Sequence, residues 1–346
     1  MPGTTLKLTA PSDHDLARDV CSYGYFLLAP NRWDPQARAF SRVLELAGGP
    51  AGVLIDQRPS GELRARFDRR LERSEHGAAR AQLARMLCLD VSSEEVRAFH
   101  RVDPRWKRSG RARLFRSPTL LEDVIKTVTS CNVAWTSTIH MNRRLCEVCG
   151  RTSPTGLHAF PTARRLSRTR PGTLRARCRV GYRDQRMVDL AKLFVRGAID
   201  EAWLSDAATP DDDVFKFLVT LPGIGPYAAG NIMQLLGRYS RLALDTESVR
   251  HAKVVLGHEG TDAQILRRLP GHYEPFGVHK FRSYWFELWA FYESKAGPAH
   301  TWDRDTTGQT FTAANLNRDT SGKAAVKRSV AARQPRSGAR ASEARR

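Results

Sequence analysis

The N-terminal part of the chain carries the apolar pattern of a β-sheet. Leu63, Ala65 and Phe67 alternate with charged residues, which is the period of a strand with one buried face. Two continuous apolar runs precede this segment, at residues 23–29 and 53–55, and a turn sequence at 58–61 separates it from the second run. We therefore expect residues 1 to about 75 to be mostly sheet.

From about residue 78 the apolar positions follow helical spacing. Ser92 and Glu95 form a capping box that opens one helix. Further apolar stripes predict helices that start at 117–118, at 133 and at 187, with a last one over 283–292. This order predicts an α+β fold, in which a small antiparallel sheet domain (1–105) is followed by an all-helical domain (106–298).

A glycine-rich turn between two of these helices is the most informative local feature. Thr209 to Asp212 has the composition of a helix start, and Pro222-Gly223 ends that helix. Gly225-Pro226 begins a second helix that runs to about Leu236. Two glycines two residues apart let the backbone turn sharply and approach another molecule closely, and the start of the second helix favours a phosphate.

This turn, Leu221 to Gly225, together with the later Asp245, resembles the helix-hairpin-helix DNA glycosylases. In that superfamily the hairpin grips the DNA backbone and precedes a catalytic aspartate. The resemblance covers about Cys21 to Tyr292. Within the superfamily, the chain is similar to the branch that contains the 8-oxoguanine and alkylpurine (3-methyladenine) glycosylases. It also rests on short stretches in the same chain order: Cys88-Leu89-Asp90-Val91, Arg116-Ser117-Pro118, Ser130-Cys131-Asn132-Val133-Ala134, Phe160-Pro161-Thr162 and Gly181-Tyr182-Arg183.

Charge and composition agree with a nucleic-acid partner. The 346 residues contain 56 Lys and Arg against 36 Asp and Glu, a formal net charge of +20. Residues 318–346 supply nine of the basic and two of the acidic residues, so the rest of the chain stays near +13. Beyond about residue 297 apolar periodicity is lost, which predicts a disordered basic tail at 299–346.

The start of the chain does not resemble a signal peptide, and no run of about 18 apolar residues could span a bilayer. We therefore expect a soluble, monomeric, cytoplasmic protein that associates with the nucleoid and binds double-stranded DNA containing a damaged base. Cys146 and Cys149 form a lone C-x-x-C pair without a second pair, so we expect no metal and no other cofactor. The absence of cysteine after Cys178 excludes the four-cysteine iron–sulfur cluster that some relatives carry there.

Asp245 is the candidate catalytic residue. Breaking an N-glycosidic bond builds positive charge on the sugar, and a nearby carboxylate stabilises that charge and orients or deprotonates water. Asp245 precedes a helix start, whose N–H groups would favour the ionised carboxylate. The same position also fits an aspartate that only caps the helix.

The resemblance implies roles for other residues. Members that also cleave the strand use a lysine where this chain has Tyr227, so we expect a monofunctional enzyme without AP-lyase activity. Phosphate contacts are expected at the hairpin, and wedging of the duplex at the segments around Ser130 and Tyr182. The base pocket is expected near the last helix. The candidate DNA-binding residues are Gly223, Ile224, Gly225, Ser130, Asn132, Tyr182 and Arg183, and the candidate pocket residues are Tyr227, Phe276 and Trp285, with a sheet-side wall at Cys21–Phe26.

The main hypothesis is a base-excision-repair glycosylase for an alkylated or oxidised purine flipped out of duplex DNA. Two alternatives remain at this point. One is a glycosylase for a mismatched or deaminated base. The other is a non-catalytic DNA-binding protein that uses the hairpin only for backbone contacts.

Overall fold

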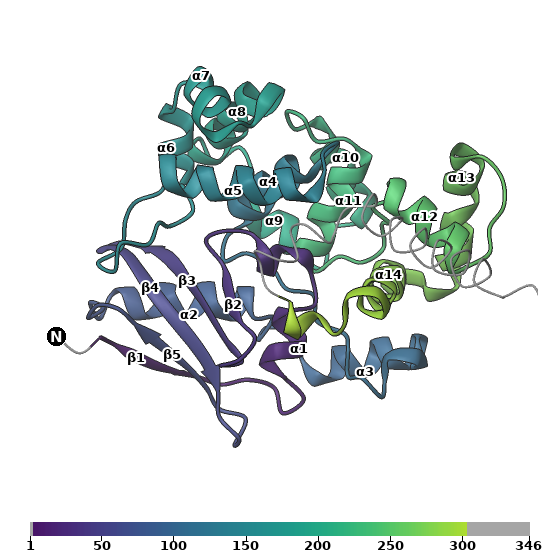
Figure 1. The fold of residues 1–346 in the computed structure, drawn as a ribbon, viewed down its shortest axis with the longest axis horizontal. Coiled ribbons are helices and arrows are strands. Elements are labelled where there is room, and N and C mark those ends of the chain that lie inside the picture. Colours follow the sequence, from purple (N-terminus) through teal and green to yellow (C-terminus); the bar gives the residue numbers. More distant parts are fainter. Residues whose placement is uncertain (1–2, 303–346) are drawn as a thin grey trace, which may run out of the picture.

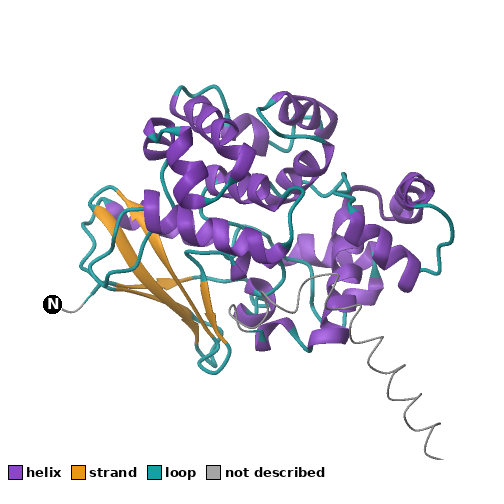
Figure 2. Cartoon of the chain, turned by 45° about the horizontal axis from the view of Figure 1, so that its top comes forward, coloured by secondary structure: helices purple, strands orange, loops and turns teal. Residues whose placement is uncertain are grey.

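The computed structural model describes residues 3–302, so the part of the predicted basic tail beyond residue 302 lies outside the described residues. The predicted α+β class is confirmed, because one antiparallel sheet near the N-terminus is followed by a large helical part (Figures 1 and 2). No helix among the described residues is both long and apolar enough to cross a membrane.

The sheet has five strands in the order β1-β5-β4-β3-β2, and all neighbours are antiparallel. The alternating segment predicted at Leu63 is strand β5, whose apolar side chains are buried on one face. The central strands β3 and β4 are joined by a tight turn in which Gly49 has a φ of +122°. The strand bounds are β1 Thr5–Leu8, β2 Arg32–Asp34, β3 Ala39–Leu46, β4 Gly49–Gln57 and β5 Leu63–Phe67.

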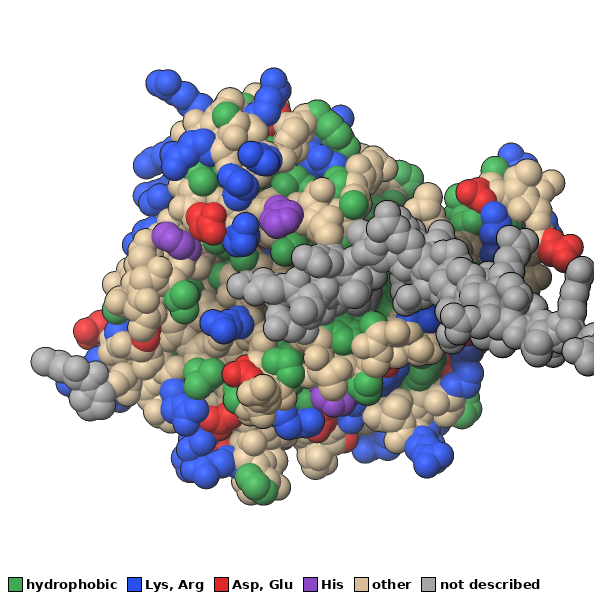
Figure 3. All heavy atoms as spheres, viewed as in Figure 1, with side chains coloured by type: hydrophobic (Ala, Val, Ile, Leu, Met, Phe, Trp, Pro, Cys, Tyr) green, Lys and Arg blue, Asp and Glu red, His purple; other side chains and the backbone are tan. Residues whose placement is uncertain are grey.

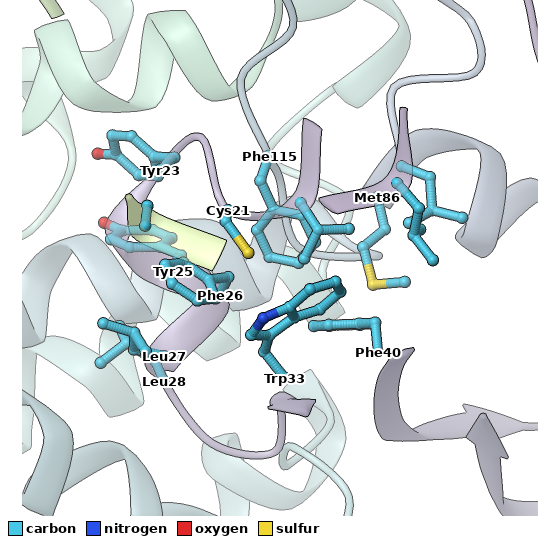
Figure 4. Close-up of a cluster of buried hydrophobic side chains, with 14 of the residues drawn as sticks. Cys21, Tyr23, Tyr25, Phe26, Leu27, Leu28, Trp33, Phe40, Met86 and Phe115 are labelled. Carbon is cyan, nitrogen blue, oxygen red and sulfur yellow. The ribbon is translucent and has the colours of Figure 1, made fainter. Parts of the chain in front are cut away.

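The apolar run at residues 23–29 is not a strand, contrary to the expectation that this region is mostly sheet. Gly24–Leu27 forms a short 3-10 helix, η1, which lies between the sheet and the helical part. Its own Phe26 and the preceding Cys21 lie in the core near Phe115, whereas the Tyr23 ring points away from Phe115 (Figure 4). A segment that is buried on several sides lacks alternation, so its sequence does not distinguish a strand from a tight helical turn.

The helical part matches the predicted stripes closely. The Ser92–Glu95 capping box is present and opens α3. The helix predicted at 117–118 begins two residues later, after the cap Thr119. The helix bounds are α1 Leu16–Val20, α2 Glu75–Met86, α3 Ser93–Val102, α4 Leu120–Ser130, α5 Trp135–Cys149, α6 Ala163–Arg168, α7 Pro171–Thr173, α8 Asp184–Val195, α9 Glu201–Ser205, α10 Asp211–Thr220, α11 Pro226–Leu235, α12 Thr246–Val254, α13 Asp262–Tyr273 and α14 Lys280–Ala296.

The last helix, α14, joins the two parts of the molecule. Its Trp289 belongs to the same apolar cluster as Phe26 and Phe40 from the sheet side. A second apolar cluster lies within the helical part, among α4, α5, α8, α10 and α11. The packed chain continues to Trp302, which is buried with its ring 5.2 Å from that of Trp289. Helix α11 belongs to the second cluster and packs against α4 and α10.

Candidate active site

The hairpin forms between α10 and α11 as predicted, with the first helix beginning at Asp211 rather than at Pro210. Gly223 has a φ of +78°, and a Cβ there would come within 2.6 Å of the Arg186 Cδ atom, so only glycine fits this turn without strain. Gly225 caps α11 and is exposed. Within the described residues, the amides of Gly225 and Tyr227 donate no hydrogen bond, so the start of α11 offers free N–H groups to an anion.

Ile224 does not present its side chain to a ligand. It is only 4% exposed and packs in the helical core, and its N–H donates to the Leu221 carbonyl oxygen at 3.1 Å. The Ile224 side chain therefore anchors the turn from inside, and a contact of Ile224 with DNA stays a prediction. The outward groups of the hairpin belong to the two glycines.

Asp245 stands at the start of α12 and is half-buried. Its Oδ1 atom accepts hydrogen bonds from the N–H of Glu247 at 3.0 Å, the N–H of Ser248 at 3.1 Å and the Ser248 hydroxyl at 3.2 Å. Oδ2 accepts none from the described residues, so one carboxylate oxygen is fixed and the other is free. The Ser248 hydroxyl is in turn 2.6 Å from the Tyr284 hydroxyl, which secures the cap from α14.

Burial raises the pKa of Asp245, and the negative charge of Glu247 acts in the same direction. The hydrogen bonds from Ser248 and Glu247 lower the pKa but do not offset the burial. The sequence-based expectation that the helix start favours the ionised form is thus only partly right. The helix start supplies the donors, whereas the desolvation of the site is the larger effect.

The extended segment that carries Asp245 packs directly on α11. A Cβ added at Gly230 would come within 2.8 Å of the Leu242 carbonyl oxygen and 3.3 Å of the Ala243 Cα atom. Glycine therefore lets the Leu242–Asp245 backbone approach the hairpin's second helix. This contact was not predictable from the sequence, because a glycine inside a helix has several possible causes.

Asp245 opens into a cavity of about 410 Å³ between α11, α14, η1 and the α4–α5 junction. Four residues named as site candidates from the sequence line it: Asp245, Tyr227, Trp285 and Ser130. Trp285 is held by a 2.8 Å hydrogen bond from its indole Nε1 to the Ser22 carbonyl oxygen. Tyr23 and Tyr25, from the predicted sheet-side wall, also line the cavity.

Several aromatic wall residues were missed by sequence reasoning. Trp135 begins α5, and its ring lies 3.1 Å from where a Gly24 Cβ would be, so Gly24 makes room for the indole. Tyr284 and Tyr292 come from α14. These missed residues belong to two separate helices, α5 and α14, and no spacing rule links them. Tyr23, from the predicted sheet-side wall, donates from its hydroxyl to the Asn231 Oδ1 atom of α11 at 2.8 Å.

Phe276 does not line the cavity. Its ring packs against Tyr273, with centroids 6.3 Å apart, and under the Arg105 guanidinium at 5.1 Å. It lies in the short 3-10 helix before α14, whose Tyr284, Trp285, Trp289 and Tyr292 line the cavity, and its place in the base pocket stays a prediction.

The predicted wedge residues separate into exposed and buried groups. Tyr182 is 52% exposed, and Asn132 is exposed with a φ of +52°. Arg183, by contrast, is only 6% exposed and donates to the carbonyl oxygens of Val128 (3.1 Å), Val180 (3.3 Å) and Cys131. Arg183 therefore ties the end of α4 to the turn before α8, and its predicted contact with DNA stays a prediction.

An arginine that the sequence did not single out takes the exposed position instead. The Arg186 guanidinium lies 5.1 Å from the centre of the Tyr182 ring, and its side chain packs against Gly223. Arg186 is thus the side chain that links the hairpin to Tyr182. Among the described residues no group of three His, Cys, Asp or Glu side chains could hold a metal ion.

Comparison with known proteins identifies the fold. No protein-family model and no curated protein matches the chain. Among solved structures, the apo form of the Clostridium acetobutylicum 8-oxoguanine glycosylase/lyase is similar with a TM-score of 0.61 at 15% identity, over 82% of this chain and 95% of that one. The Archaeoglobus fulgidus 3-methyladenine DNA glycosylase has a TM-score of 0.60 at 16% identity, over 84% and 99%.

The Clostridium enzyme has also been solved in complex with double-stranded DNA containing cytosine opposite 8-oxoguanine, and that structure matches with a TM-score of 0.60 at 14% identity, over 85% and 99%. The chain therefore has the fold of these 8-oxoguanine and 3-methyladenine glycosylases, and the resemblance inferred from the sequence is confirmed at the level of the fold.

Proposed function

We propose that the protein is a DNA glycosylase that hydrolyses the N-glycosidic bond of a damaged purine extruded from duplex DNA. The observation that carries the proposal is the half-buried carboxylate of Asp245, which keeps one oxygen without a donor among the described residues and lines an aromatic cavity beside the helix that the glycine hairpin begins. A protein that only binds the DNA backbone needs no desolvated acid next to a polyanion.

Asp245 acts on the sugar in this proposal. As the bond between C1′ and the base nitrogen breaks, its electron pair leaves with the base and positive charge develops on the sugar ring. The ionised carboxylate stabilises that charge, and it accepts a proton from the water that forms the new C1′–O bond. The Ser248 and Glu247 donors on Oδ1 hold the carboxylate in one orientation, which leaves Oδ2 for this role.

The cavity favours a cationic base over a neutral one. Its described lining contains two carboxylates, Asp245 and Glu247, and no Lys, Arg or His. The electron-rich faces of Trp135, Tyr227 and Trp285 attract a positive charge, by about 0.5–2 kcal/mol for each well-placed ring. An N-alkylated purine carries that charge and leaves as a neutral base without prior protonation. An alkylated purine is therefore the preferred substrate class.

Strand cleavage is not expected. A Schiff-base mechanism needs an amine at the sugar, and no lysine is among the described residues that line the cavity. Two lysines of the helical part have other partners: Lys216 is exposed beside Asp213, and Lys126 is buried against Glu122 at 2.7 Å. Borohydride should trap no covalent adduct between the protein and lesion-containing DNA, and an adduct would contradict this part of the proposal.

The test is a panel of duplexes that carry 7-methylguanine, 3-methyladenine, 8-oxoguanine, hypoxanthine, uracil or mismatched adenine. Base release is scored by chromatography, and strand breaks are scored with and without alkali. The proposal predicts release of the cationic bases and breaks only after alkali. Release confined to 8-oxoguanine would reject the substrate class, and no release from any duplex would support the non-catalytic alternative.

A further inference from the structure

The segment from α5 to the turn before α8 concentrates positive charge. Residues 135–183 contain eleven arginines, no lysine and a single carboxylate, Glu147. This segment therefore supplies a net +10 of the chain's +20. Lys and Arg side chains gather over α6, α7 and α8 at the top of the face in Figure 3. Like charges repel one another and destabilise a folded chain, so this concentration of arginines is unfavourable for the folded protein by itself.

Most arginines that serve the fold of this protein have carboxylate partners. Arg42 pairs with Glu122 at 2.8 Å in the interior, and on the surface of α3 Arg97 pairs with Glu94 at 2.8 Å. Six exposed arginines in the segment have no ion pair with any described residue, and one of them, Arg165, donates instead to the Cys149 carbonyl oxygen at 2.6 Å. The other five have no such partner among the described residues. They form what we call the arginine surface: Arg164, Arg168, Arg170, Arg177 and Arg179.

Two shallow hollows shape this surface. Arg164, Arg165, Arg168 and Arg177 line one of about 380 Å³, and no carboxylate is among its lining residues. Arg143, Arg144 and Arg179 line the other, of about 280 Å³. The Arg144 guanidinium donates to the Arg177 carbonyl oxygen at 3.2 Å and so connects the two hollows. Guanidinium groups around a concave surface suit phosphate oxygens.

The arginine surface is continuous with the hairpin. Arg186 of α8 contacts Gly223 on one side and the Tyr182 ring on the other. Tyr182 follows Arg179 by three residues, in the turn that leads into α8. A path of cationic side chains therefore runs from the hairpin, over the start of α8, to α5 and α6.

We propose that the arginine surface is a second DNA-binding surface, which contacts backbone phosphates of the duplex that flanks the site held by the hairpin. This inference rests on the proposed function, which identifies the bound polyanion as double-stranded DNA. Its contacts are to phosphates, so it adds affinity for DNA of any sequence and does not select the lesion.

The first test measures binding of the full chain to an undamaged duplex over a series of salt concentrations. The test variant carries Arg164→Gln, Arg168→Gln and Arg177→Gln. The control variant carries Arg58→Gln, Arg70→Gln and Arg73→Gln, which removes three exposed arginines without ion pairs from the sheet side. Each phosphate contact contributes about 0.9 to the slope of log K against log salt, so the test variant should lose about 2 to 3 from that slope and bind about tenfold or more weakly at low salt.

The control variant should change little. Equal losses in both variants would show an effect of net charge alone, and an unchanged slope in the test variant would show that these arginines do not touch DNA. Either result overturns the proposal. Because the duplex is undamaged and no chemistry is scored, the outcome does not depend on whether the protein releases a base.

A second measurement tests on which side of the lesion the flanking duplex contributes to affinity. Duplexes carrying a non-cleavable abasic analogue are extended by about two helical turns (~20 base pairs) on one side or the other. The arginine surface lies on one side of the hairpin, so only one extension should raise affinity, and the test variant should lose that gain. Equal gains from both extensions would count against the surface. Lack of preference for the analogue would count against the proposed function instead, and the salt slopes would still decide the surface.

Discussion

The contact between Gly230 and the segment that carries Asp245 gives the most specific prediction. Replacing Gly230 with alanine adds a Cβ that would lie 2.8 Å from the Leu242 carbonyl oxygen, 3.1 Å from its carbon and 3.3 Å from the Ala243 Cα atom. All three atoms are backbone atoms, so no flexible side chain can move aside. Ordinary contact begins at 3.4 Å, so the segment must move by about 0.6 Å relative to α11.

Two effects on stability oppose each other in Gly230→Ala. Removing a glycine from a helix stabilises by about 0.5–1 kcal/mol, whereas overpacking costs about 1–3 kcal/mol. We expect a net loss of about 1 kcal/mol. The effect on rate should be larger, because a displacement near 1 Å in a catalytic group can cost about 100-fold. A shift of about 0.6 Å should lower the single-turnover rate of base release about tenfold.

Gly77→Ala is the matched control. Gly77 also lies in a helix, α2, but an added Cβ would meet nothing within 4 Å. This variant should be stabilised by about 0.5–1 kcal/mol and release base at the wild-type rate. Both variants are measured well below their unfolding temperatures, so that loss of folded protein does not mimic loss of rate. A wild-type rate in Gly230→Ala would refute the reasoning that α11 positions Asp245.

Three further predictions concern the site. Burial raises the pKa of Asp245, and the ionised form is the active one, so the single-turnover rate should fall as the pH drops through this raised pKa. A pH–rate profile whose acidic limb lies at or below the ordinary pKa of 3.8 would contradict this prediction. Arg183→Ala should lower the unfolding free energy by about 2–4 kcal/mol, because three carbonyl groups lose a charged donor. A variant with wild-type stability and weakened DNA binding would instead indicate that Arg183 contacts DNA. Gly225→Leu should fold normally, since nothing lies within 4 Å of the added Cβ, yet it should bind all duplexes less tightly. A loss of affinity confined to some DNA sequences would argue against a phosphate contact at Gly225.

The sequence was most informative where local chemistry determines structure. The alternation at Leu63–Phe67, the capping box at Ser92 and the glycine turn before Pro226 each depend on residues a few positions apart. Asp245 belongs to the same class, since its role as a helix cap depends on Glu247 and Ser248, two and three residues further along the chain. These elements were predicted with small errors at their ends.

Features that depend on tertiary contacts were not predictable in the same way. The segment at Tyr23–Ala29 is buried from several directions, so its pattern did not show that it is a short helix. Arg183 looks like a surface arginine in sequence, and only the fold shows the three carbonyl groups around it. Trp135 and Tyr284 reach the cavity from helices about 150 residues apart. The residues that form the aromatic walls of the site could therefore be identified only from the folded structure.

The ionisation of Asp245 also links function to stability. A carboxylate whose pKa is raised by folding costs stability once it is ionised, and this cost is absent below its unfolded pKa, near the ordinary value of 3.8. Asparagine retains a side-chain oxygen that can cap the helix. Asp245→Asn should therefore unfold at the same or a higher temperature than the wild type at neutral pH, and the difference should vanish in acid.

The most direct test of the central claim is the single-turnover rate of base release by this Asp245→Asn variant, measured beside its affinity for the same lesion-containing duplex. We predict a rate lower by about 100- to 10,000-fold, the usual contribution of a catalytic acid or base, with DNA affinity unchanged. Base release at the wild-type rate by the folded variant would contradict the account.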